Sequence, residues 1–386
     1  MFTKIFSIIF LLSLTFSALA QDFQQIADGI EYAEVVRGTE KEPIRANLLR
    51  LDLTKVRLDV VHALDAAIGL EKTSSIAARH GAIAAINAGF FRLDKSIFAG
   101  DDVGVLQIDG KLLSESYGNR IALGILNRKE KTEVNFGHLI ANWEGGYVVD
   151  SAIVFSGVNR ERKANEVILY TPEFHRTTLT DSSGMEIILD DCSSRCNKTK
   201  VIENTGSAVI PSNGYVISIG KDAKEKAKTV LFYAKKIQKK TYDKIALYRH
   251  FDPIEAEQRL LFYRAEDIVA GVPQLIKNGK IEITWEQEKT NKSFVETKHP
   301  RTAVAKLKDG KFLMVTVDGR SESSGGIGLQ QLAEFLLEQG ATDAMNLDGG
   351  GSTTMFLNGK VVNHPSDKEG ERSVGDAILV FPRKKQ

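Results

Sequence analysis

Four short turn signals constrain the fold of this chain more than any other feature. Each is an Asn-Gly or Asp-Gly pair followed by lysine, with apolar residues on both sides: Asp109-Gly110, Asn278-Gly279, Asp309-Gly310 and Asn358-Gly359. Such pairs tolerate the positive φ angles at the centre of two-residue type I′ turns, which join antiparallel strands. The pattern therefore predicts a strand-rich α+β fold, built of mixed sheets with antiparallel hairpins.

A different connection is predicted in the last third of the chain. Residues 311–317 are expected to form the return strand of the Asp309-Gly310 hairpin, and 343–347, which alternate as a strand does, form a second short strand that ends at Asp348. Between them lie residues with helical spacing, namely Leu329, Leu332, Ala333 and Leu336, and Gly340 is expected to end this helix. A strand, a helix and a strand in this order are typical of a crossover between parallel strands.

A run of three glycines follows the second of these strands. Consecutive glycine amides can form an anion-binding nest, and the missing Cβ atoms let a ligand approach the backbone. A second strand end, at Asn87, also carries a glycine two residues later, Gly89. The candidate binding residues at these two strand ends are Asn87, Gly89, Asn346, Gly349, Gly350, Gly351, Ser352 and Thr353. A tight turn that only connects strands is the alternative reading of the glycine run.

Asp318 ends the strand before the predicted helix, as Asp348 ends the strand after it. Parallel strands would place both carboxylates on the same edge of the sheet. If Asp309-Gly310 is a two-residue turn, counting back predicts that Arg301 lies opposite Asp318 and keeps its carboxylate ionised. Arg320 adds a second guanidinium, and arginine binds phosphate through paired hydrogen bonds. Two carboxylates are the catalytic groups of most glycoside hydrolases. The alternatives are a structural ion pair for Asp318 with Arg301 and a solvated loop charge for Arg320.

The N-terminus and the charge balance limit where the chain works and what it binds. Lys4, an apolar stretch to Phe16 and the triplet Ala18-Leu19-Ala20 are typical of a signal peptide over 1–20, so we expect an exported protein, periplasmic or secreted. A net charge of +1 gives no reason to expect nucleic acid as a partner. No later stretch is apolar enough to span a membrane. Cys192 and Cys196 are candidates for a local disulfide in such a compartment, with free thiols as the alternative.

Several blocks of the sequence resemble the phosphodiester glycosidase family. They are His299-Pro-Arg-Thr-Ala303, Val315-Thr-Val-Asp-Gly-Arg320, the stretch from Asp343 to Met355, and Asn87-Ala-Gly-Phe-Phe91, with weaker blocks at 157–160, 168–172 and 270–275. The resemblance adds Thr302 and Gly319 to the candidate binding residues. It covers most of the mature chain and implies one catalytic domain over 21–386, in which 151–263 is the hardest part to interpret. Three positions depart from the family pattern: glycine is usual where Ala88 and Ala270 stand, and glutamate is frequent at Gln331.

The resemblance implies hydrolysis of a sugar-1-phosphodiester in a cell-envelope or extracellular glycan, without a cofactor or metal ion. Asp318 and Asp348 would be catalytic, in roles that the sequence leaves open, and Arg301 and Arg320 would hold the phosphate. Retention or inversion, metal dependence and the oligomeric state are also left open. The alternatives are a glycan-binding protein without catalysis and a metal-assisted phosphodiesterase that uses Asp318, Asp343 and Asp348.

Overall fold

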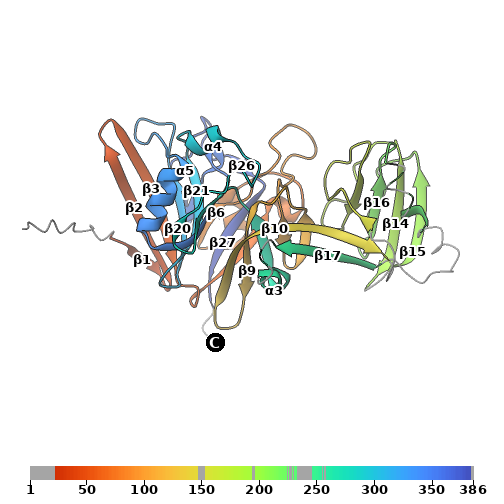
Figure 1. Ribbon diagram of the computed structural model, residues 1–386, viewed down its shortest axis with the longest axis horizontal. Helices are drawn as coiled ribbons and strands as arrows, with labels where there is room; N and C mark the ends of the chain where they lie inside the picture. Colours follow the sequence, from red (N-terminus) through yellow and green to blue (C-terminus); the bar gives the residue numbers. More distant parts are fainter. Residues whose placement is uncertain are drawn as a thin grey trace, which may run out of the picture.

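The computed structural model describes residues 22–383, apart from 147–152, 194–195, 224, 226–227, 229, 233–245, 254 and 256–257. The predicted signal peptide lies outside the described residues. Among those that are described, no helix is long and apolar enough to cross a membrane. In Figure 1 the strands dominate, and β10 and β17 lead from the larger body of the molecule to a smaller sheet at one end.

Strands of the described residues form four larger sheets and one two-stranded sheet. The eight-stranded sheet has the order β1 (Gln24–Ala27), β2 (Ile30–Thr39), β3 (Glu42–Leu51), β22 (Phe312–Val317), β21 (Arg301–Leu307), β23 (Ala341–Asn346), β19 (Gln274–Lys277) and β20 (Lys280–Ile281). A five-stranded sheet has the order β25 (Lys360–Val361), β24 (Met355–Leu357), β6 (Ala84–Asn87), β27 (Asp376–Pro382) and β4 (Val56–His62).

The other sheets are formed largely by the middle of the chain. The seven-stranded sheet contains β11 (Ile153–Val154), β10 (Thr132–Gly146), β9 (Ile121–Asn127), β18 (Asp267–Ala270), β7 (Leu106–Ile108) and β8 (Lys111–Ser114), with β17 (Ala246–Pro253) paired to β10. The smaller sheet at the end of the molecule contains β12 (Gly157–Val158), β13 (Val167–Tyr170), β16 (Tyr215–Ile219), β14 (Met185–Cys192) and β15 (Cys196–Glu203). Strands β26 (Ser373–Val374) and β5 (Glu71–Lys72) pair separately.

Helices are few and short in the described part of the chain. They are α1 (Thr73–His80), α3 (Arg259–Arg264), α4 (Lys292–Glu296) and α5 (Leu329–Glu338), with 3₁₀ turns η1 (Ala63–Asp65) and η3 (Gly350–Ser352). The predicted α+β class with mixed sheets is confirmed.

Three of the four predicted hairpins form as expected. At Asp109-Gly110, Asn278-Gly279 and Asn358-Gly359 both central residues have positive φ, and the flanking residues pair directly across the turn. This is the type I′ geometry that the two-residue pattern predicts.

The Asp309-Gly310 hairpin has a longer loop than predicted. Leu307 pairs with Lys311, which leaves three residues in the loop, and only Gly310 among them has positive φ. The Lys308 amide donates instead to the carbonyl of Gly340, at the entry to β23, at 3.0 Å. A three-residue loop with an αL glycine is the next commonest hairpin after the two-residue ones. The whole pairing of β21 with β22 is therefore shifted by one residue.

This shift overturns the predicted pairing of Arg301 with Asp318. Arg301 lies opposite Val317. Because side chains alternate between the two faces of a strand, a shift of one residue moves them to opposite faces. The Arg301 guanidinium donates to the carbonyls of Phe294, Thr297 and Ile327 and forms no ion pair with Asp318.

The predicted crossover is present, with one strand between its ends. Strands β22 and β23 are both antiparallel to β21, so they run parallel to each other, and α5 connects them. Leu329, Leu332, Ala333 and Leu336 are all fully buried on the face of α5 that covers the sheet, and Gly340 has a φ of 87° just after the helix. This arrangement brings the ends of β22 and β23 to the same edge of the eight-stranded sheet.

The other face of that sheet packs on the five-stranded sheet. Val304, Met314 and Met345 from the first sheet share a buried cluster with Ile86 and Ile378 from the second. Strand β6 therefore ends next to β21 and β23, which places Asn87 at the edge where Asp348 follows β23.

Candidate active site

Asn87 ties the three chain segments at this edge together. Its side-chain amide donates to the carbonyl of Asp348 at 2.7 Å, and its oxygen accepts from the Thr302 hydroxyl at 2.8 Å and the Thr354 amide at 3.0 Å. The Asp348 amide in turn donates to the carbonyl of Ala88 at 2.9 Å. Asn87 and Thr302 are both fully buried. They therefore hold the Asp348 segment in place from the interior and present no free polar group at the surface.

Asp348 begins a tight turn formed by the glycine run. Its carboxylate accepts a hydrogen bond from the Gly349 amide at 3.0 Å, and its side chain is only partly accessible. Burial raises the pKa of Asp348 to about 6, against the opposing effects of the Ser352 hydroxyl, the Gly349 amide and the charge of Arg372. A carboxyl with this pKa changes its charge close to neutral pH, which suits proton transfer.

The glycine turn leaves little of the predicted amide nest free. The Gly349 amide is bound to Asp348, and the Gly350 amide donates to the carbonyl of Pro300 at 2.9 Å. Gly350 has a φ of 60°, and a Cβ there would lie 3.0 Å from the Arg320 guanidinium. A Cβ on Gly351 would lie 2.2 Å from the guanidinium of Arg372. Two guanidinium groups therefore lie directly against the glycine run.

Four buried polar atoms around this turn have no hydrogen-bond partner in the described part of the chain. They are Asn346 Oδ1, Ser352 Oγ, Thr353 Oγ1 and Thr354 Oγ1. The Ser352 hydroxyl also lowers the pKa of Asp348. Buried polar groups are normally satisfied, so such a cluster marks a place where a ligand or water completes the hydrogen bonds.

Arg320 is an exposed guanidinium in a strained backbone conformation. Its φ is +62°, which is uncommon for a residue with a side chain and costs on the order of 1–2 kcal/mol. Its one hydrogen bond, to the Ser366 hydroxyl, is long at 3.4 Å, and no carboxylate pairs with it among the described residues. Strain that directs an unpaired cation toward a glycine turn is typical of ligand-binding sites.

Arg301 and Gly319 lie behind this surface. Arg301 is 2% exposed, its guanidinium stacks over the ring of Phe294 at 4.8 Å, and burial lowers its pKa to about 10. The charges of Arg301 and Arg320, after burial, lower the pKa of His299. Gly319 lies against Pro300, where a Cβ would be 2.8 Å from the backbone. Arg301 is therefore too buried to contact a ligand directly and contributes only its positive charge to the site.

Asp318 is buried and orients a histidine that the sequence reasoning missed. Its carboxylate accepts from His364 twice, through the amide and through Nδ1 of the ring, each at 3.0 Å, and from Asn363 at 3.4 Å. Asn363 also donates to the carbonyl of Thr353, which connects Asp318 to the glycine turn. The Asn358-Gly359 hairpin could have revealed the position of Asn363 and His364. Counting its register places Val362 opposite Met355, so Asn363 follows next to the glycine turn.

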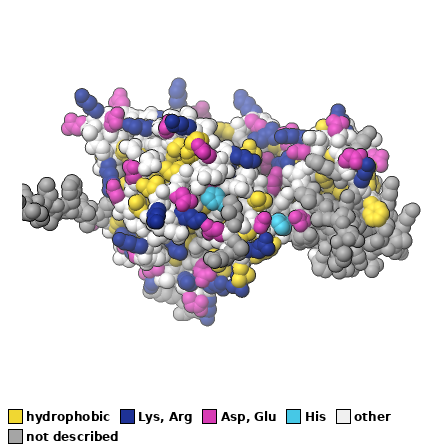
Figure 2. Space-filling view, in the orientation of Figure 1, with side chains coloured by type: hydrophobic (Ala, Val, Ile, Leu, Met, Phe, Trp, Pro, Cys, Tyr) yellow, Lys and Arg dark blue, Asp and Glu magenta, His cyan; other side chains and the backbone are white. Residues whose placement is uncertain are grey.

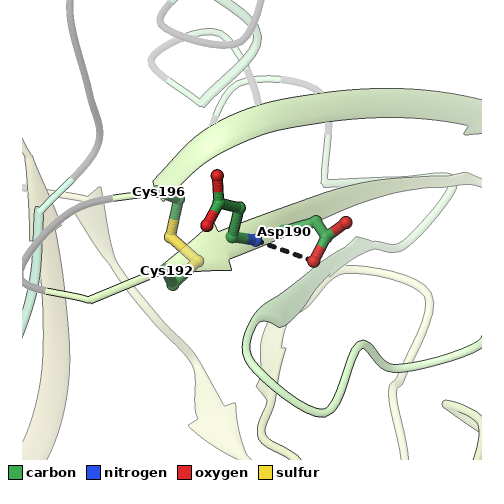
Figure 3. Close-up of a disulfide and its surroundings, with 4 residues drawn as sticks. Asp190, Cys192 and Cys196 are labelled. Atoms are coloured by element: carbon green, nitrogen blue, oxygen red, sulfur yellow. Dashed lines mark hydrogen bonds between the residues drawn. A yellow bond between two sulfur atoms is a disulfide. The ribbon is translucent and has the colours of Figure 1, made fainter.

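Gly89 and the two cysteines take no part in the contacts described above. The Gly89 amide donates to the buried carboxylate of Asp376 at 2.6 Å. Cys192 and Cys196 form a disulfide that joins the paired ends of β14 and β15 in the smaller sheet, close to Asp190 (Figure 3). Within the described residues, no group of three or more His, Cys, Asp or Glu side chains is arranged to hold a metal ion.

The face of the described residues seen in Figure 2 shows no large area of one charge. In Figure 2 basic and acidic side chains alternate over the visible face of the described residues, in keeping with the net charge of +1. The positive charge at the edge described above therefore comes from the local guanidinium groups rather than from the overall charge.

Comparisons with known proteins show which family part of this chain resembles. Residues 193–381 match the family model described as phosphodiester glycosidase. The N-acetylglucosamine-1-phosphodiester alpha-N-acetylglucosaminidase of Bos taurus is 42% identical over 109 residues, which cover 26% of this chain and 20% of the relative. The match thus spans about a fifth of the length of that enzyme.

Two solved structures share the fold at low sequence identity. A hypothetical protein from Synechocystis has a TM-score of 0.75 and 20% identity, over 95% of this chain and 64% of its own. A candidate exported protein of Burkholderia pseudomallei has a TM-score of 0.72 and 23% identity, over 88% of this chain and 74% of its own.

Proposed function

Residues 193–381 belong to the phosphodiester glycosidase family, and from this premise we propose that the chain is an exported hydrolase of sugar-1-phosphodiesters. It would cleave the glycosidic bond in cell-envelope or extracellular glycans, releasing the sugar and leaving a phosphomonoester on the acceptor. The observation that carries the proposal is Asp348, a partly accessible carboxyl with a pKa of about 6. It lies on the glycine turn against which Arg320 and Arg372 are placed.

The phosphate would bind at the glycine turn. Arg320 has no carboxylate partner among the described residues, so its guanidinium is available to an anion. The Ser352 and Thr353 hydroxyls lack partners in the part of the chain that the structure describes and could donate to phosphate oxygens. Arg372 is paired with Asp367 at 2.7 Å and would contribute to the local positive potential rather than bind directly. Arg301 would add to that potential from its buried position.

Asp348 acts in this proposal as a base toward the attacking water. The leaving group is a phosphomonoester, whose second pKa is about 6, so it can depart without a proton donor. The step that needs help is activation of water, which an ionised carboxylate supplies. Asp348 takes one proton from water as the oxygen attacks the anomeric carbon, and the electron pair of the broken carbon–oxygen bond leaves on the phosphate. The guanidinium of Arg320 stabilises that negative charge.

Asp318 and Asn363 do not contact the reacting atoms in this proposal and act indirectly. The Asp318 carboxylate is saturated by hydrogen bonds from His364 and Asn363, and it is 1% exposed. We therefore revise its expected catalytic role to that of a positioning residue. It holds the segment that supports Thr353 and leaves the ring of His364 at the surface, where the side chain is 67% exposed.

Hydrolysis in oxygen-18 water tests the bond that is broken. We expect the label in the released sugar and none in the phosphomonoester when the substrate is a sugar-1-phosphodiester. Label in the phosphate would instead establish cleavage on the phosphorus side, as a metal-assisted phosphodiesterase would do. Binding without turnover of any phosphodiester tested would leave a glycan-binding protein.

The pH dependence follows from the pKa of Asp348. Because the ionised form is the base, kcat/KM is expected to rise tenfold per pH unit below pH 6 and to level off above it. If Asp348 instead acted as a general acid in its protonated form, kcat/KM would fall above pH 6. Initial rates between pH 4.5 and 8, with stability checked at each pH, distinguish these outcomes.

A further inference from the structure

A polar cavity lies away from the glycine turn, where the main body of the molecule meets the smaller sheet. Its volume is 580 Å³, and it is lined by the loop after β6, the end of β8, the middle of β10 and the segment after β12. In Figure 1 this is the region that β10 crosses on its way to the smaller sheet. Asp318, Arg320 and Asp348 do not line it.

The charges of this cavity do not suit a phosphate. Five acidic residues and three basic ones line it. Arg160 is already bound by Glu115 at 2.6 Å and Glu166 at 2.8 Å, and Arg92 by Glu161 at 2.6 Å. An anion would have to displace these carboxylates to reach either guanidinium, and Lys163 alone does not balance the five acidic residues, so the lining favours a neutral ligand.

A buried carboxylate in the lining has incomplete hydrogen bonding. The Asp102 side chain is 5% exposed; its Oδ2 forms an ion pair with His62 Nε2 at 3.3 Å, and its Oδ1 has no hydrogen bond among the described residues. Burial and the charge of Asp102 raise the pKa of the neighbouring Asp376 well above its usual range, so that this carboxyl is neutral. Buried oxygens are normally satisfied, and a hydroxyl group of a ligand would supply the donor that Oδ1 lacks.

The neighbouring Asp101 complements this acceptor. Burial, followed by the charges of Asp102 and Glu115, raises the pKa of Asp101 to about 8. At neutral pH it is therefore mostly protonated and can donate a hydrogen bond, while Asp102 and Glu115 accept. A hydrogen-bond donor next to acceptors matches the hydroxyl groups of a sugar, each of which can both donate and accept.

Two apolar side chains complete the lining. The ring of Tyr117 is 54% exposed and is held by the guanidinium of Arg120 at 4.9 Å, and Ile140 is 43% exposed. An exposed, immobilised ring offers apolar area at little entropic cost. A pyranose ring, with C–H groups on its faces and hydroxyls at its rim, has the matching distribution.

We propose that this cavity binds a neutral sugar residue, and, resting on the proposed function, that it holds part of the glycan beyond the bond that is cleaved. A short segment connects the two places. The Asp348 amide donates to the carbonyl of Ala88, and the Val103 amide, in the cavity lining, donates to the carbonyl of Phe90 at 2.7 Å. Two residues of chain span at most about 7 Å, so a glycan of a few residues could reach both.

Calorimetry and saturation-transfer NMR with neutral oligosaccharides test the cavity directly. The probes are tri- and tetrasaccharides of glucose, galactose, mannose and N-acetylglucosamine, none of which carries phosphate. At least one is expected to bind, and Tyr117→Ala is expected to weaken that binding at least tenfold without loss of thermal stability, since the ring is exposed. Ile97→Ala, which removes an exposed apolar side chain outside the cavity, is the matched control and should bind as the parent chain does.

The outcome separates this proposal from the proposed function. Asp348→Asn should bind the oligosaccharide with unchanged affinity, because Asp348 does not line the cavity. Hydrolysis of phosphodiesters without binding of any neutral oligosaccharide would overturn the cavity proposal alone, as would full binding by Tyr117→Ala. Binding without hydrolysis would leave the cavity proposal standing and overturn the proposed reaction.

Discussion

Asp348→Asn is expected to lower turnover of a sugar-1-phosphodiester by about 10³-fold or more, with the fold retained. An amide cannot take a proton from water, and loss of a general base or of a stabilising charge has effects of this size. The hydrogen bond from the Gly349 amide can be kept by the oxygen of asparagine. Steady-state rates of the variant and the parent chain at pH 7 provide the measurement.

Stability is the control for this variant, and its sign follows from the raised pKa. Because the folded chain holds the Asp348 proton more tightly than the unfolded chain, ionisation of Asp348 costs stability as pH rises through the range from about 4 to about 6. Removing the charge should therefore leave thermal stability at pH 7 equal to or above that of the parent chain. Activity like that of the parent chain, in a variant of native stability, would refute the assignment of Asp348.

Arg320→Asn is expected to lower kcat/KM by about 10²–10³-fold, while stability is unchanged or slightly higher. The substitution removes the guanidinium that the proposal places on the phosphate, and a lost charge-stabilising donor has effects of this order. Asparagine adopts positive φ more readily than arginine does, so the strain at this position, where φ is +62°, is relieved. Activity and thermal unfolding are both measured, because the prediction is that activity falls without a loss of stability.

Arg320→Lys is the matched variant for this test. It keeps the charge but loses the paired donors of the guanidinium, so an intermediate activity is expected. If Arg320→Asn retained full activity, or if its loss of activity simply followed a loss of stability, Arg320 would not be the phosphate-binding group.

Local sequence determined much of this fold because the signals involved act over a few residues. Type I′ turns require positive φ at two adjacent positions, which Asp109-Gly110, Asn278-Gly279 and Asn358-Gly359 tolerate, and the paired strands follow from the turn. The apolar spacing of α5 likewise determines which face is buried. The strand ends at Asn87 and Asp348 were visible for the same reason, although their meeting depends on the packing of the two sheets against each other.

Tertiary structure decided the features that depend on partners far away in the chain. The Asp309-Gly310 hairpin has a turn pair like the other three, yet the carbonyl of Gly340 takes the Lys308 amide and shifts the register by one residue. That single contact separates Arg301 from Asp318. The partner of Asp318, His364, lies 46 residues further along the chain, and the cavity around Asp102 gathers four separate segments. Local propensity carries no information about such contacts, because their energy comes from groups that only the folded chain brings together.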